Sequence, residues 1–225
     1  MLNYEVDPAL LLSFVPAGTE LDCWNGQAFV SLVGFRFLKT KLLGFLPVPM
    51  HSNFDEVNLR FYVRRQAGNE VRRGVVFIRE MVPRQAIAFV ARTFYNENYA
   101  AVPMAHEIHS VGDHGLSVAY RWRNEERWSE INLETEGLCE LPGDGSVEQF
   151  ITEHYWGYAA QPGGGCMEYR VAHPSWRVWQ VRQAAYEGEA EEFFGRGIAA
   201  VLRGKPESAF LAEGSAVTVM RGRKV

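Results

Sequence analysis

The sequence predicts a mostly β protein of the α+β class, built on antiparallel strands with a few brief helices. Short apolar segments separated by turn signals are numerous, while helix-like segments are few. Strands that do not alternate with long helices argue against a parallel βαβ architecture. No low-complexity linker interrupts residues 1–225, so we expect one domain.

The first quarter of the chain predicts a short helix, a strand and a loop. Asp7 can cap a helix that runs to Phe14, with Pro8 in its first turn. The Asn25-Gly26 turn signal introduces a strand over residues 28–37. Residues 42–50 contain one glycine and two prolines, which predicts a loop.

The remaining strands follow from alternation and turn chemistry. Residues 66–70 predict a hairpin loop, Ser146 predicts a helix start, and the three glycines at 163–165 predict a flexible turn. That turn lacks the G-K-[ST] continuation of a phosphate loop. The expected strands are 54–65, 71–80, 86–91, 106–111, 116–123, 127–134, 167–172, 178–185 and 216–220, and the expected helical segments are 92–99, 146–155 and 190–202.

Composition narrows the functional classes. The net charge of −4, from 23 basic and 27 acidic residues, argues against a nucleic-acid partner. No apolar run approaches the ~18–20 residues that span a bilayer, and the N-terminus lacks signal-peptide features. We therefore expect a soluble, cytoplasmic protein without a membrane partner.

The cysteines and histidines do not form a recognised metal motif. Cys23, Cys139 and Cys166 are widely spaced and contain no C-x-x-C pair, which predicts reduced, mostly buried thiols. His106 and His109 are three apart and would point to opposite faces of a strand. We expect no metal and no cofactor.

One strand carries a row of polar side chains that could form a site. In residues 53–65 apolar side chains alternate strictly with polar ones, and successive side chains of a strand point to opposite faces. The row is either a solvated sheet face or the lining of a polar cavity. Its four members are Glu56, Asn58, Arg60 and Tyr62, and the opposite face carries Val57, Leu59, Phe61 and Val63.

Other candidate residues carry weaker signals. Arg92 follows an apolar segment and is retained as a ligand-binding candidate, whereas Tyr95 and Tyr99 are expected to pack an amphipathic turn. His154 is expected to belong to an aromatic helix end. The roles of His154, His173 and Cys166 stay open at this level.

Six landmarks together resemble a known family. Their order and spacing resemble the YqjF-like family of uncharacterised bacterial proteins, which is distantly related to acetoacetate decarboxylase. The resemblance covers nearly the whole chain and implies an antiparallel β-barrel around a central cone-shaped cavity, with peripheral helices. The landmarks are LDCWNGQAFVSLVGF (21–35), EVNLRFYV (56–63), RGVVFI (73–78), ARTFYNENYAAVPM (91–104), FITEHYWGY (150–158) and VAHPSW (171–176).

The sequence departs from the decarboxylase at the catalytic lysines. Acetoacetate decarboxylase forms a Schiff base on a lysine of a Pro-Lys-Lys sequence. The similar segment here is Val102-Pro103-Met104-Ala105, and neither Met104 nor Ala105 can form an imine. We therefore expect no Schiff-base decarboxylation.

The resemblance favours a pocket for the polar row and leaves three functions open. In the first, the cavity binds a small organic anion, a carboxylate for example, with Arg60 and Arg92 as its charge partners and Asn58 and Tyr62 as further ligand-binding residues. In the second, a lyase or another carbon-acid enzyme uses Glu56 as a base whose pKa is raised. In the third, the chain is a structural or interaction protein in which Arg60 is paired with Glu56.

Two structural expectations follow from the pocket. If the polar row is inside, the apolar face of its strand must be covered by helices and by the segment around Tyr155 and Trp156. Arg60 should then keep a carboxylate partner, and Glu56 is the nearest on the same face. The oligomeric state stays open, and a homo-oligomer is among the alternatives.

Overall fold

The computed structural model describes residues 1–38, 41–42, 46–47, 53–83 and 98–225, without the side chains of residues 39–52. The segment 86–91, Arg92 and Tyr95 lie outside the described residues. The first two helical turns, η1 (Pro8–Leu10) and η2 (Leu12–Phe14), are 3-10 turns, so the single helix expected there is wrong in type. Asp7 does cap the first turn, since its Oδ1 accepts a hydrogen bond from Ala9 N at 2.9 Å.

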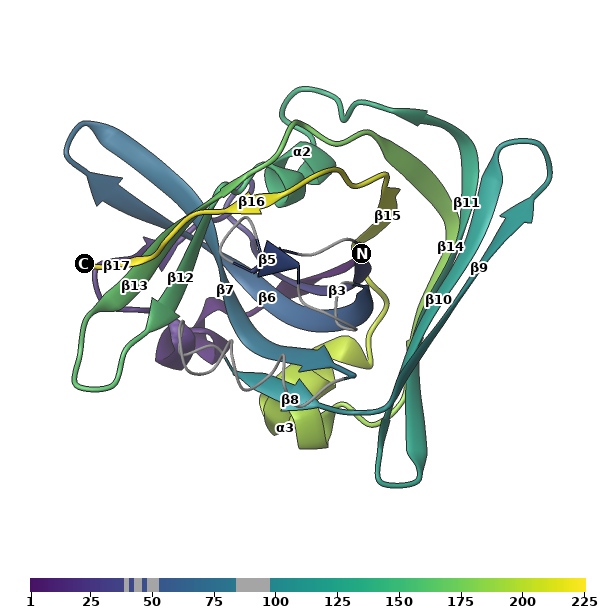
Figure 1. The fold of residues 1–225 in the computed structure, drawn as a ribbon, viewed down its shortest axis with the longest axis horizontal. Coiled ribbons are helices and arrows are strands. Elements are labelled where there is room, and N and C mark those ends of the chain that lie inside the picture. The colour runs from purple at the N-terminus through teal and green to yellow at the C-terminus, as the bar shows by residue number, and fades with distance from the viewer. Residues whose placement is uncertain (39–40, 43–45, 48–52, 84–97) are drawn as a thin grey trace.

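Strands make up most of the chain, as the sequence predicts (Figure 1). They are β1 (Leu2–Val6), β2 (Glu20–Leu21), β3 (Ala28–Phe37), β4 (Lys41–Leu42), β5 (Leu46–Pro47), β6 (Phe54–Ala67), β7 (Glu70–Val82), β8 (Tyr99–Ala101), β9 (Met104–Val111), β10 (Gly115–Asn124), β11 (Arg127–Glu140), β12 (Trp156–Ala160), β13 (Cys166–Ala172), β14 (Val178–Glu187), β15 (Ser208–Ala212), β16 (Thr218–Val219) and β17 (Arg223–Lys224).

Fifteen strands join in one mainly antiparallel sheet in the order β16-β13-β12-β7-β6-β3-β1-β15-β14-β11-β10-β9, with β2, β8 and β17 pairing at its sides. Among the described strands, only β12 with β7 and β8 with β7 pair in parallel. The sheet path ends at β9 and β16, which do not pair with each other in the described part of the chain. The described strands therefore form one strongly curved sheet, and the barrel closure that was expected from the family resemblance is not observed.

The α-helices of the described residues, α2 and α3, lie on different sides of the sheet in Figure 1. Ser146 begins α2 (Val147–Thr152), its Oγ accepting a hydrogen bond from Gln149 N at 3.2 Å. The helix α3 (Glu191–Leu202) contains a kink at Gly195, whose φ of +79° suits a residue without Cβ. Both helices were predicted, although α2 ends at Thr152, three residues before the expected end.

The sequence missed several strands. β1, β2, β8, β12, β15 and β17 were not predicted, and β8 begins at Tyr99, which was expected to end a helical segment. The expected loop at residues 42–50 contains the short strands β4 and β5. β12 begins at Trp156, directly after the residues that the sequence assigned to the helix end. Each of the missed strands has five or fewer residues, too short for alternation to separate it from a helix or loop.

The apolar face of β6 packs between the two halves of the sheet. Val57, Leu59, Phe61 and Val63 are fully buried in one large cluster with side chains of β10, β11 and α3. A Cβ on Gly34 of β3 would meet Tyr120 Cδ2 at 2.7 Å and Ile131 Cδ1 at 2.8 Å. β3 and β6 therefore lie directly against β10 and β11 on this face.

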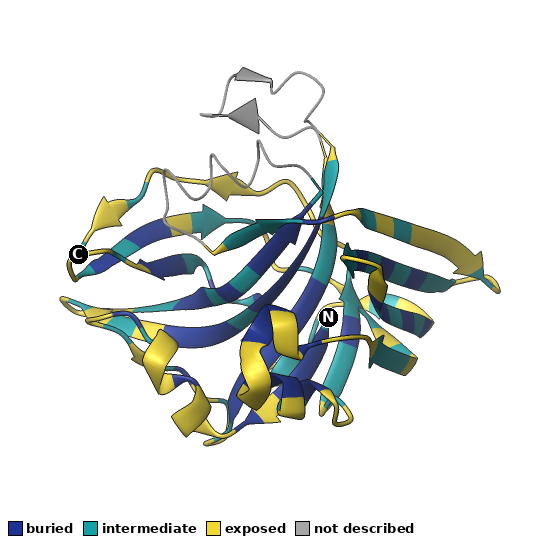
Figure 2. Ribbon diagram, turned by 90° about the horizontal axis from the view of Figure 1, so that it is seen from below, coloured by how far each residue is buried: buried dark blue, intermediate teal, exposed yellow. Residues whose placement is uncertain are grey.

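The opposite face of β6 is covered by a second cluster around α2. Tyr62 packs there with Phe29, Phe150 and Phe210. Both faces of β6 are thus buried, as the pocket interpretation requires, and the middle of the sheet is the most buried part of the molecule (Figure 2). The expected cover is only partly right, because β10, β11 and α3 provide most of it on the apolar face.

The structure also bears on two further expectations, which concern membrane spans and the burial of the cysteines. No helix within the described residues is long and apolar enough to cross a bilayer. No disulfide joins the three cysteines, and of the three only Cys166 is buried, while Cys23 is exposed and Cys139 is intermediate. The expectation of mostly buried thiols is therefore wrong for Cys23.

Candidate functional site

The polar row predicted on β6 lies inside the protein. Glu56, Asn58 and Tyr62 are each at most 2% exposed, and Arg60 is partly buried. The register of β6 with β7 shifts at Arg60, because Leu59 pairs with Arg79 whereas Arg60 pairs with Phe77. Such an irregularity re-aims side chains and is common next to functional sites.

The row continues across the sheet as a polar stripe. Arg60 pairs with Ser31 on β3, Ser31 with Asn3 on β1, and Asn3 with Ser208 on β15. Ser31 Oγ donates to Asn3 Oδ1 at 2.6 Å, and Asn3 Nδ2 donates to Ser208 Oγ at 3.0 Å. The Tyr62 hydroxyl lies 2.6 Å from Ser31 Oγ, so it is tied into this stripe.

Glu56 is a buried carboxyl group whose pKa is strongly raised. Burial raises the pKa to about 7, against the opposing effects of hydrogen bonds from Asn58 and Tyr99 and of the charge on Arg60. Asn58 Nδ2 donates to Oε1 at 3.1 Å, and the Tyr99 hydroxyl donates to Oε2 at 3.3 Å. Near neutral pH this group can both accept and release a proton.

Arg60 lacks the carboxylate partner that the sequence predicted. Among the described residues no ion pair joins Arg60 to Glu56 or to another carboxylate, so that expectation is wrong. Met1 Sδ lies 3.9 Å from its Nη2, and the centroid of the Tyr62 ring lies 5.9 Å from its Cζ. Its buried Nε has no hydrogen-bond partner among the described residues. A partly buried guanidinium without a counter-charge is unusual, because burying an unpaired charge is costly.

A second carboxyl group borders the row at Asn58. The buried Glu80 on β7 stands directly opposite Asn58 in the ladder. Asn58 Oδ1 is itself buried and has no hydrogen-bond partner among the described residues. Sequence alternation on β7 could not identify Glu80, because the irregularity at Arg60 changes which of its side chains share a face with the row.

A buried histidine–aspartate pair lies behind Tyr62. His154 Nε2 is 3.1 Å from Asp22 Oδ2, which also accepts from Arg73 Nε at 2.6 Å. Burial alone would raise the pKa of Asp22, but hydrogen bonds from His154 and Arg73 outweigh it and lower that pKa. Burial lowers the pKa of His154 to about 4, so its ring is neutral at pH 7.

His154 occupies the aromatic packing that the sequence predicted. Its ring centroid is 4.6 Å from that of Tyr62 and 5.0 Å from that of Phe150. Because Asp22 accepts at Nε2, the neutral ring carries its proton there, and Nδ1 stays as a buried acceptor without a partner. The link to Asp22, 132 residues away, had no signal in the sequence.

An aromatic stack lies near Arg60. The His173 ring packs on Trp176 with centroids 4.1 Å apart and on Tyr155 at 4.9 Å. Burial lowers the pKa of His173, and the positive charge of Arg60 lowers it further. His173 therefore lies within electrostatic range of Arg60.

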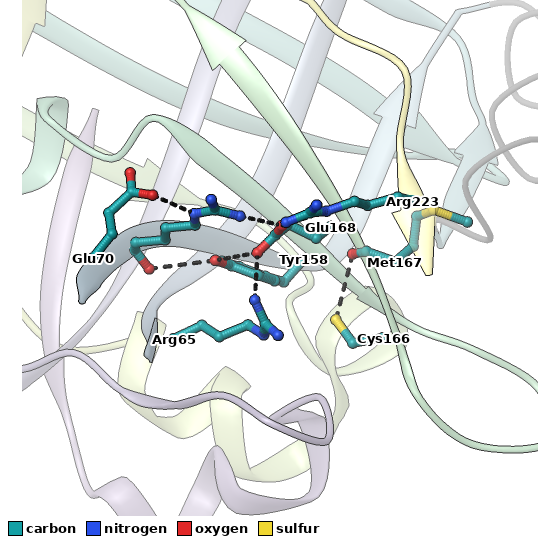
Figure 3. Close-up of polar contacts among 8 residues, drawn as sticks. Arg65, Glu70, Tyr158, Cys166, Met167, Glu168 and Arg223 are labelled. Atoms are coloured by element: carbon teal, nitrogen blue, oxygen red, sulfur yellow. Dashed lines mark hydrogen bonds and ion pairs between the residues drawn. The ribbon is translucent and has the colours of Figure 1, made fainter. Parts of the chain in front are cut away.

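A separate ionic cluster surrounds Glu168 on β13 (Figure 3). Its fully buried carboxylate accepts from Arg65 at 3.1 Å, Arg72 at 2.7 Å and Arg223 at 2.9 Å. The Tyr158 hydroxyl donates to the same group at 3.3 Å. Both carboxylate oxygens are occupied, so this cluster joins β6, β7, β13 and β17 and has an architectural role.

The structure does not place every candidate. Arg92 lies outside the described residues, and its ligand-binding role stays a prediction. Cys166 follows the glycine turn predicted at residues 163–165, begins β13 and is fully buried. The described residues contain no group of three or more metal-ligating side chains. An open surface groove lies elsewhere, lined by Ala105, Arg121, Trp128, Glu130, Glu187 and Gly188.

A comparison with known protein families shows to which family the chain belongs. A family model described as DUF2071, "Uncharacterized conserved protein (COG2071)", matches residues 1–216. The chain belongs to the DUF2071 family. The uncharacterized protein YqjF of Bacillus subtilis (strain 168) is 30% identical over 105 residues, which are 47% of this chain and 42% of YqjF. The match thus spans less than half of that relative, and the predicted YqjF-like resemblance is confirmed.

Solved structures confirm the fold. The enduracididine biosynthesis enzyme MppR, complexed with pyruvate, superposes with a TM-score of 0.67 and 13% identity over 99% of this chain and 86% of that chain. An acetoacetate decarboxylase from Legionella pneumophila superposes with a TM-score of 0.62 and 14% identity, over 100% of this chain and 82% of that chain. An acetoacetate decarboxylase-like enzyme from Sphingomonas wittichii RW1 superposes with a TM-score of 0.60 and 14% identity, over 97% of this chain and 84% of that chain. At these identities the likeness shows the acetoacetate decarboxylase-like fold alone.

Proposed function

We propose that this DUF2071 protein binds a small organic anion, a carboxylate, at Arg60. The observation that carries the proposal is the partly buried guanidinium without a carboxylate partner in the described part of the chain. Guanidinium and carboxylate groups match in bidentate geometry, and the pairing is strong where water is partly excluded. A bound carboxylate would supply the missing counter-charge.

The state of Glu56 supports an external partner for Arg60. Because burial raises the pKa of Glu56 to about 7, a substantial fraction of this group is protonated at neutral pH. A protonated carboxyl group does not neutralise Arg60. The pyruvate complex of the fold relative MppR supports the choice of a small carboxylate. Schiff-base chemistry is not part of the proposal, because Met104 and Ala105 stand at the lysine-like positions.

Thermal shifts with matched variants test the binding. Pyruvate, lactate and acetoacetate are compared with neutral esters on the wild type, Arg60→Ala and Arg64→Ala. Arg64 is the control, since it lies on the same strand but is exposed and paired with Glu20 at 2.8 Å. The proposal expects a ligand-dependent stabilisation, ~2.7 kcal/mol at a hundredfold excess over Kd, that Arg60→Ala alone removes. If none of the acids shifts the melting temperature, the result would favour a structural or interaction protein without a ligand.

A carbon-acid enzyme is the second candidate, favoured by the raised pKa of Glu56. In this alternative Arg60 holds the carboxylate while Glu56 removes a proton from the neighbouring carbon. Deuterium exchange at that carbon, followed by proton NMR in heavy water, separates the two functions. Exchange that Glu56→Gln abolishes while binding persists favours the enzyme. Binding without exchange favours the binding protein.

A further inference from the structure

The long free edge of the sheet points to a partner. Strand β9 pairs with β10 over all eight of its residues and has no neighbour on its other side in the described part of the chain. Alternate residues of an edge strand direct their N–H and C=O groups away from the sheet. At the other end of the sheet order, β16 has only two residues. The free edge of β9 is therefore the longest at either end of the sheet.

Apart from the charged Glu107, the sequence of this edge lacks the features that normally protect one. Met104–Val111 contains no lysine and no proline, and the ladder with β10 has no irregularity. Ile108 at its middle is 46% exposed, and Glu107 and His109 on either side of it are also exposed. An exposed apolar side chain on an unpaired, regular edge favours pairing with another strand.

The side chains of Glu107, which also accepts a hydrogen bond from Arg121 Nη1 at 2.7 Å, and of His109 fit a second copy of the same strand. In an antiparallel pair about a two-fold axis through Ile108, Glu107 of each copy faces His109 of the other, and Ile108 faces Ile108. Shifting the axis to Glu107 places two carboxylates opposite each other, and shifting it to His109 places two imidazoles opposite each other. Opposite cross-strand partners stabilise a sheet, whereas like charges destabilise it.

We propose that two copies of this chain associate through β9, in the antiparallel register centred on Ile108. The pairing makes one continuous sheet from the β9–β10–β11 halves of both copies. It is independent of the binding proposed at Arg60, which lies on β6.

Disulfide trapping tests the register directly. The accessible thiols are first removed by Cys23→Ser and Cys139→Ser, which leaves the buried Cys166. In this background Ile108→Cys places two thiols across the axis, with Cβ atoms about 4.5–5.5 Å apart. Ser110→Cys places them about 13 Å apart, four residues along the strand. Leu138→Cys, 60% exposed on β11, is the control for random collision.

The expected result is a crosslinked dimer from Ile108→Cys that forms about tenfold faster than from Ser110→Cys or Leu138→Cys, because only the first pair brings the two thiols near disulfide distance. Light scattering on the wild type should give about twice the chain mass of 25.5 kDa, and Ile108→Lys should lower it with an unchanged circular dichroism spectrum. A monomeric wild type overturns the proposal, including the case in which β9 receives a strand from another protein. Equal crosslinking of all three variants, or a dimer that Ile108→Lys leaves intact, overturns it as well.

Discussion

At the scale of single residues, the site is defined by two groups whose charges do not cancel. Arg60 is partly buried and lacks a carboxylate partner among the described residues, and Glu56 is fully buried with a pKa near 7. They share one face of β6 and influence each other electrostatically without forming an ion pair. Burial thus raises the pKa of Glu56, and it makes the charge of Arg60 costly to leave without a partner.

The raised pKa of Glu56 predicts a pH-dependent stability difference. The folded state binds this proton more tightly than the unfolded chain, so stability is greatest below the unfolded pKa of about 4.5 and falls as pH rises to about 7. Glu56→Gln removes this dependence. Its free energy of unfolding relative to wild type should rise by roughly 3 kcal/mol between pH 4 and pH 8, as measured by urea denaturation. A difference that stays flat with pH would contradict the buried, protonated carboxyl group.

The sequence identified part of this site and missed the rest for physical reasons. Strict alternation on one strand is a local signal, so it placed Glu56, Asn58, Arg60 and Tyr62 on one face, and the family resemblance then favoured burial of that face. Contacts between distant segments leave no such signal. The stripe through Asn3 and the contact of His154 with Asp22 depend on strand order and helix placement, which alternation does not encode.

At the scale of elements, the Glu168 cluster determines how the C-terminal strand is held. Arg223 brings β17 to a carboxylate that also binds Arg65 of β6 and Arg72 of β7 (Figure 3). The Arg72 guanidinium also lies over the Trp156 ring at 4.3 Å, which adds β12 to the cluster. The buried carboxylate on β13 therefore connects this strand with β6, β7 and β17, and through Arg72 with β12.

Removing this carboxylate should destabilise the fold strongly. Glu168→Gln leaves three guanidinium groups around a neutral amide, and breaking a buried ion pair on one side costs about 3–5 kcal/mol. Glu20→Gln is the matched control, because its pair with Arg64 is exposed on both sides and contributes about 0–1 kcal/mol. Urea denaturation measures both variants. Equal losses in the two would show that the Glu168 cluster has no special role.

The contact between the two halves of the sheet gives a second prediction at this scale. Gly34→Ala would place a methyl group 2.7 Å from Tyr120 and 2.8 Å from Ile131, so β3 and the β10–β11 pair must separate. Overpacking of this kind costs about 1–3 kcal/mol. Gly143→Ala, which meets nothing within 4 Å, is the control and should change stability by less than about 0.5 kcal/mol. Thermal denaturation distinguishes them, and indistinguishable melting curves would refute this packing.

At the scale of the whole molecule, the β-rich fold was predictable and its closure was not. Turn signals and alternation located most long strands, and the family resemblance gave the acetoacetate decarboxylase-like architecture that the comparisons confirm. Whether the sheet closes depends on its curvature and on which strands end it. Here β9 and β16 do not meet in the described part of the chain. A single domain over residues 1–225 remains a prediction.

The most direct test of carboxylate binding at Arg60 is the nitrogen-15 NMR signal of its Nε–H group. This group is buried and unpartnered, and its resonance is assigned by its loss in Arg60→Lys. Titration with pyruvate or lactate should shift this signal saturably, while a neutral ester should leave it unchanged, because only the acid supplies the missing counter-charge. A signal that stays in place while the acid binds elsewhere, or while no binding occurs, would contradict the account.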